Sequence, residues 1–152
     1  MPLLLQEVTD ERDFDEILPM LFAAFGEPYN SLRRWFFPIH TTTEAAVEAS
    51  KQRHIQAWRE HPDLHWVKVT DTDSGKIIGA AEWEIRPEVD PDGRPQVPIN
   101  AYWHTEGSVE KEFAEKLLTS LKSFMKERMT RPHLGMYMRP GFTTITWIGE
   151  LT

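Results

Sequence analysis

The sequence predicts a single domain, residues 1–152, of the α/β or α+β class, with helices packed on a mostly antiparallel mixed sheet. Two observations carry this prediction. Apolar residues recur with a period of two in several short segments, and with the period of an amphipathic helix in longer ones. The segments follow one another as strand, helix, helix, strand, strand, helix, strand and strand. This order is typical of helices that cover a sheet.

The predicted sheet is centred on a hairpin at residues 65–85. Val67 and Val69 alternate with Trp66, Lys68 and Thr70. Within residues 77–85, Trp83 and Ile85 likewise alternate with Glu82 and Glu84. Residues 71–75 between them contain Asp, Ser and Gly, which favour turns. A hairpin alone is only marginally stable in water, so we expect the flanking helices to cover its apolar face.

Two helices are predicted between a first strand at Leu3–Val8 and this hairpin. In the first helix, apolar residues from Phe14 to Phe25 recur at helical spacing after a cap at Thr9 or Asp10. Pro19 removes one backbone donor from this helix, which predicts a kink. The second helix is predicted from Glu44 to His61, with a cap offered by Thr41, Thr42 or Thr43. Its expected buried residues are Val47, Ile55 and Trp58.

The second half of the chain predicts one long helix and two strands. Residues 86–98 contain four prolines and read as a surface loop. Ser108 is the predicted cap of the long helix, which Pro132 ends. The last two strands are expected at 133–138 and 142–149, around a turn at Arg139–Gly141.

Composition excludes several classes of function. The net charge is −7 and the 17 Lys and Arg residues are scattered, so no basic patch predicts a nucleic-acid partner. The absence of cysteine excludes disulfides, thiolate nucleophiles and cysteine-ligated zinc. No signal peptide or membrane-spanning run is recognisable. We expect a cytoplasmic protein without a membrane partner.

Aromatic residues are the expected lining of a ligand site. The segment from Glu27 to Pro38 is rich in aromatic side chains and is bounded by prolines. These rings either line a pocket for a small molecule or plug the end of the core. The candidate substrate-binding residues are Tyr29, Trp35, Phe36, Trp83 and Trp103.

Candidate catalytic residues lie in the predicted hairpin and in the segment before the long helix. Glu82 and Glu84 are two residues apart, so both point to one face of a strand. If that face lines a cleft, either carboxylate can act as a general base, and otherwise both are solvated on the outer face. His104 is either an acid or base near neutral pH or a surface histidine. No metal is expected, because Pro62 separates His61 from His65.

Four stretches within residues 3–134 resemble the GNAT acetyltransferase superfamily, and most of all its fungal-type members that act on small molecules. These stretches are Ile17–Gly26, Pro28–Pro38, Val67–Trp83 and Arg131–Leu134. The resemblance implies an acetyl-CoA-dependent N-acetyltransferase with a small-molecule acceptor. It also implies that Tyr137 lies near the thioester.

The chain departs from the family after residue 134. Family members continue into a Gln/Arg-x-x-Gly-x-Gly/Ala turn and a helix, whose N–H groups hold the pyrophosphate of acetyl-CoA. Here Met138 leads directly into Arg139–Gly141, which permits only a hairpin. We therefore expect a shortened GNAT-like fold with no assignable cofactor-binding residues. An open sheet edge in such a fold favours a homodimer.

Three functions are consistent with these patterns. The first is acetyl transfer from acetyl-CoA. The second is a repurposed enzyme that acts on an apolar small molecule without acetyl-CoA. The third is a non-catalytic, dimeric binding or regulatory module.

Overall fold

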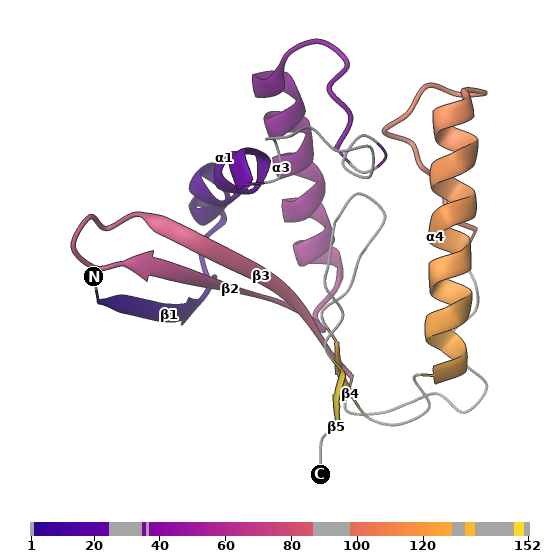
Figure 1. Ribbon diagram of the computed structural model, residues 1–152. Coiled ribbons are helices and arrows are strands. Elements are labelled where there is room, and N and C mark those ends of the chain that lie inside the picture. Colours follow the sequence, from indigo (N-terminus) through magenta and orange to yellow (C-terminus); the bar gives the residue numbers. More distant parts are fainter. Residues whose placement is uncertain are drawn as a thin grey trace.

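Neighbouring strands of the sheet are also neighbours in the sequence. The computed structural model describes residues 2–24, 35, 37–86, 98–128, 133–135 and 148–150. Within these residues the sheet has five strands in the order β1-β2-β3-β4-β5 (Figure 1). All four strand pairings are antiparallel. The strands are β1 (Leu3–Glu7), β2 (Leu64–Asp71), β3 (Ile77–Arg86), β4 (His133–Gly135) and β5 (Ile148–Glu150).

The predicted fold class is confirmed, since the structure is a mixed α and β domain with an antiparallel sheet. The predicted antiparallel pairing of the last two strands is also confirmed, because β4 pairs with β5 from His133 opposite Glu150. The sheet contains no parallel pair among the described strands, so its expected mixed character is not observed. The predicted turn at Arg139–Gly141 lies outside the described residues.

The central hairpin forms through its turn chemistry. Asp71 accepts a backbone hydrogen bond from Gly75 at 2.8 Å, and its side chain accepts from the Ser74 hydroxyl at 2.7 Å. Gly75 has φ 71°, a conformation that glycine adopts without strain. The turn therefore sets the β2–β3 register, in which Trp66 faces Glu82.

The helices begin at the predicted caps. They comprise a short 3₁₀ turn η1 (Glu11–Asp13) and the helices α1 (Phe14–Ala24), α3 (Thr43–Glu60) and α4 (Val109–Arg128). Asp10 caps η1, Thr42 accepts from the Ala45 N–H at 3.2 Å, and Ser108 accepts from the Lys111 N–H at 3.1 Å. None of the described helices is both long and apolar enough to cross a membrane.

The core lies between the sheet and the helices α1 and α3, which Figure 1 shows close together beside β2 and β3. Phe14 is fully buried, and its ring centre is 5.3 Å from that of Trp66 and 5.8 Å from that of Trp58. Helix α4 contributes Ala114 and Leu118 to the same cluster. The apolar residues that recur at helical spacing in the predicted helices thus supply most of this buried core.

The buried side of α3 is more polar than predicted. Its buried residues are Ala46, Ser50, His54 and Ile55, whereas the predicted Val47 and Trp58 are only partly buried. His54 Nδ1 donates to the Ser50 carbonyl at 2.7 Å. The burial of His54 is tolerated because the hydrogen bond to the Ser50 carbonyl satisfies its Nδ1–H group.

Candidate functional site

Two carboxylates lie on the helix-covered face of β3. Glu82 is 6% exposed and Glu84 is 3% exposed, and each faces a buried residue of β2. The alternative that both are solvated on the outer face is therefore wrong. Arg86 donates from Nε and Nη2 to Glu84 Oε1 at 2.9 and 2.6 Å. This ion pair compensates the charge of Glu84 within the protein.

The Trp35 carbonyl joins two segments that are far apart in the sequence. Trp103 Nε1 and His104 Nε2 both donate to this oxygen at 2.9 Å. His40 Nε2 in turn donates to the Trp103 carbonyl at 2.7 Å. We call Trp35, His40, Trp103 and His104 the tryptophan–histidine cluster. Helix α4 borders it, since the Phe113 ring centre is 4.4 Å from that of Trp35.

His104 is buried, so the prediction of a surface histidine is wrong. Because Nε2 of His104 donates to a carbonyl, which can only accept, that nitrogen carries the proton. In the neutral ring Nδ1 is then the basic nitrogen, and the same holds for His40. The cluster can thus offer an oriented imidazole as a general base to a bound molecule.

The structure brings only some of the predicted site residues together. Trp35, Trp103 and His104 meet in the cluster, while Glu82 and Glu84 lie on the sheet. Trp83 alternates with the two glutamates along β3, so it points to the opposite face of the sheet. Tyr29, Phe36 and Tyr137 lie outside the described residues.

Sequence reasoning missed the polar part of α3 that adjoins the cluster. Arg53 Cζ lies 6.0 Å from the centre of the Trp103 ring, and Nη2 of Arg53 donates to Ser50 Oγ at 2.8 Å. His54 is stacked with Phe37 at a ring separation of 6.3 Å, and burial lowers the pKa of His54 to about 3. The spacing of Ser50 and His54 could have indicated this polar part of α3, because residues four apart lie on the same face of a helix.

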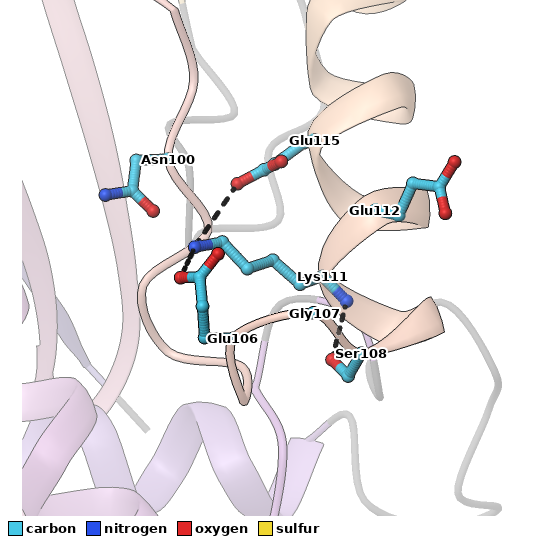
Figure 2. A pocket seen from close by; sticks show the side chains of 7 residues that line it. All are labelled: Asn100, Glu106, Gly107, Ser108, Lys111, Glu112 and Glu115. Carbon is cyan, nitrogen blue, oxygen red and sulfur yellow. Dashed lines mark hydrogen bonds and ion pairs between the residues drawn. The ribbon is translucent and has the colours of Figure 1, made fainter.

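A second group of polar residues lines a hollow of about 420 Å³ beside the start of α4. Figure 2 shows Glu106 and Glu115 pointing toward the ammonium of Lys111, while Glu112 points away from it. Glu115 also accepts from the Ala101 N–H at 3.0 Å and so holds the preceding loop. Lys111 pairs with Glu106 and Glu115, and Glu112 pairs with Lys116, which favours a structural role for this hollow. Its lining residues are Asn100, Glu106, Gly107, Ser108, Lys111, Glu112 and Glu115.

No three histidine or acidic side chains of the described residues converge in a way that would hold a metal ion. Comparison of the chain with protein families, with curated proteins and with solved structures finds no significant match.

Proposed function

We propose that this chain is a GNAT-related protein that binds a small molecule at the tryptophan–histidine cluster and acts on it without acetyl-CoA. The supporting observation is the Trp35 carbonyl, which accepts from both Trp103 and His104. The bond from His104 holds a buried imidazole in a fixed orientation, and the bond from Trp103 holds an aromatic ring beside it. Fixed polar groups within an apolar lining are typical of ligand sites.

Acetyl-CoA does not fit the residues that follow β4. A pyrophosphate cradle needs successive free N–H groups, which a glycine-rich turn and a helix N-terminus provide. In this chain β4 is followed by β5, which pairs with it in antiparallel orientation. The connecting residues 136–147 contain Gly141 as their only glycine. We therefore derive no chemical step through this cofactor.

The chemistry we propose rests on His104. A molecule that contacts its Nδ1 can lose a proton to it, while the bond from Nε2 to the Trp35 carbonyl prevents the ring from rotating. Glu82 and Glu84 are buried on β3 and take no part in this proposed step.

Calorimetric titration with acetyl-CoA and with free CoA separates these functions. We expect no heat of binding at millimolar cofactor, because the sequence after β4 contains no Gln/Arg-x-x-Gly-x-Gly/Ala motif to hold the pyrophosphate. A control titration with AMP detects binding that needs only a nucleotide. Micromolar affinity for acetyl-CoA, but not for AMP, would contradict the proposal and favour acetyl transfer.

A homodimeric binding module is the second candidate, and one observation favours it. β1 is an outermost strand of the sheet, and its residues Leu3, Leu4 and Leu5 are 57%, 45% and 67% exposed. A long apolar edge strand is a template for pairing with another chain. We propose a second copy of this chain as the partner. A cytoplasmic location remains part of the same proposal.

A further inference from the structure

Arg53 differs from the other arginines whose side chains are described. Arg12, Arg59 and Arg86 each form an ion pair with a carboxylate, namely that of Asp10, Glu11 or Glu84. Arg53 forms no such pair with any described residue. Its one protein acceptor there is the neutral Ser50 hydroxyl, at 2.8 Å.

The surroundings of Arg53 make this lack of a counter-charge unusual. Its Nε is buried and has no hydrogen-bond acceptor among the described residues. Burial also lowers the pKa of the guanidinium, which shows that the charged form is partly desolvated. Buried charges in folded proteins are normally paired. The Trp103 ring beside it attracts a cation but does not neutralise one.

Aromatic surface is available next to this charge. The Tyr102 side chain is 61% exposed, and its ring centre is 5.3 Å from that of Trp103. Arg53 is itself only partly buried and Tyr102 is largely exposed, so this group of side chains borders solvent. A ligand that uses both features has a flat apolar body and a negative charge.

We infer that Arg53 binds the carboxylate of a small aromatic acid whose ring packs against Trp103 and Tyr102. The inference rests on the proposed function, since it names the chemical class of the molecule bound at the tryptophan–histidine cluster. Guanidinium and carboxylate are both planar, and their paired donors and acceptors match in geometry. The net charge of −7 favours a singly charged carboxylate over a doubly charged phosphate.

Nitrogen-15 NMR of the tryptophan side chains tests this assignment. The chain has six tryptophans, and the spectrum of a Trp103→Phe variant identifies the Trp103 indole signal. The probes are benzoate, benzyl alcohol, benzylammonium and phenyl phosphate at constant ionic strength. We expect benzoate to shift the Trp103 signal saturably, and the other three probes to bind at least tenfold more weakly.

Variants at Arg53 separate charge from fold. We expect Arg53→Gln to weaken benzoate binding at least tenfold, and Arg53→Lys to retain part of it, because lysine keeps the charge but loses the planar fork. The matched control is Arg59→Gln, which removes an exposed arginine from the same helix. Unchanged signals of Trp58 and Trp66 show that each variant keeps its core.

The outcomes distinguish the two proposals. If benzyl alcohol or benzylammonium binds as well as benzoate, or if Arg53→Gln binds benzoate normally, the carboxylate assignment is wrong while the cluster remains a ligand site. Tighter binding of phenyl phosphate than benzoate also overturns the assignment to a carboxylate. If none of the probes shifts the Trp103 signal, both proposals fail.

Discussion

At the scale of single residues, His54 is a buried imidazole that stays neutral. It is 1% exposed, lies between Phe37 and Trp66, and donates through Nδ1 to the Ser50 carbonyl. Loss of solvation is the largest cause of its lowered pKa, and the adjacent positive charge of Arg53 acts in the same direction. Protonation of His54 therefore opposes the folded state.

The stability of the protein should depend on this group between pH 6.5 and pH 3. The pKa of His54 falls from an ordinary value of 6.5 to about 3 on folding, so within this range the unfolded chain binds the additional proton. Stability is then lost as the pH falls. We expect His54 to account for a loss of about 2 kcal/mol in the free energy of unfolding between pH 7 and pH 5.

Urea denaturation at both pH values measures this loss. The comparison variant is His54→Phe, which keeps a flat ring between Phe37 and Trp66 but cannot titrate. The variant should lose less stability on acidification than the wild type, by about 2 kcal/mol. Equal losses in the two proteins would show that folding does not lower the pKa of His54.

At the scale of secondary-structure elements, α3 connects the core to the candidate site. It carries Ile55 and His54 into the core, and Arg53 from the same turn lies beside Trp103. Its start is defined by Thr42, whose hydroxyl accepts from the Ala45 N–H in the first turn. The position of Arg53 therefore depends on a helix that begins with one side-chain cap.

Replacing this cap should weaken the helix without altering its packed side. Thr42→Ala removes the acceptor for the Ala45 N–H, and we expect a loss of about 1 kcal/mol in the free energy of unfolding. Thermal and urea denaturation measure the change. Thr41→Ala is the control, since Thr41 is exposed and precedes the cap. Equal losses in the two variants would contradict the assignment of Thr42 as the cap.

At the scale of the whole molecule, the exposed edge of the sheet determines what the protein can assemble with. Leu3 and Leu5 point to one face of the edge strand and Leu4 points to the other, and all three are exposed. Antiparallel pairing of two β1 strands would satisfy the backbone groups along the edge and would place leucines of the two copies side by side. Such a dimer leaves the tryptophan–histidine cluster on a different part of each copy.

The dimer can be tested by measuring mass in solution. We expect light scattering after size exclusion to give a dimer at micromolar concentration, and a Leu3→Lys, Leu5→Lys variant to give a monomer. Charged side chains on an edge strand prevent edge-to-edge pairing, which is the physical basis of this expectation. Ile78→Lys is the control, because Ile78 is exposed on the inner strand β3. A monomeric wild type would exclude the homodimer.

The order of the elements was predictable because local patterns produce it. Period-two and helical spacing, the turn at 71–75 and the caps at Asp10, Thr42 and Ser108 all act within a few residues. The candidate site was predictable only in part. The bond from His104 to the Trp35 carbonyl joins residues 69 positions apart, and no local pattern reports such a pairing.

Burial of polar side chains was the other point that local patterns did not predict. Polar residues such as Glu82, Glu84 and Ser50 are normally expected on a solvent-exposed face, yet all three are buried. A polar side chain is tolerated inside a protein when its partners lie nearby in space, as Arg86 does for Glu84. Arg86 lies two residues from Glu84 on the same strand face, so that partner was visible in the sequence, whereas the coverage of this face by the helices was not.

The strand order described above also has a consequence for biosynthesis. Because each strand pairs with the one before it in the chain, no strand has to be inserted between two that already pair. β1, β2, β3, α1 and α3 are all complete once residue 86 has left the ribosome. Chains fold from the amino terminus as they are made. The hairpin and the two helices can therefore pack together before α4 has been synthesised.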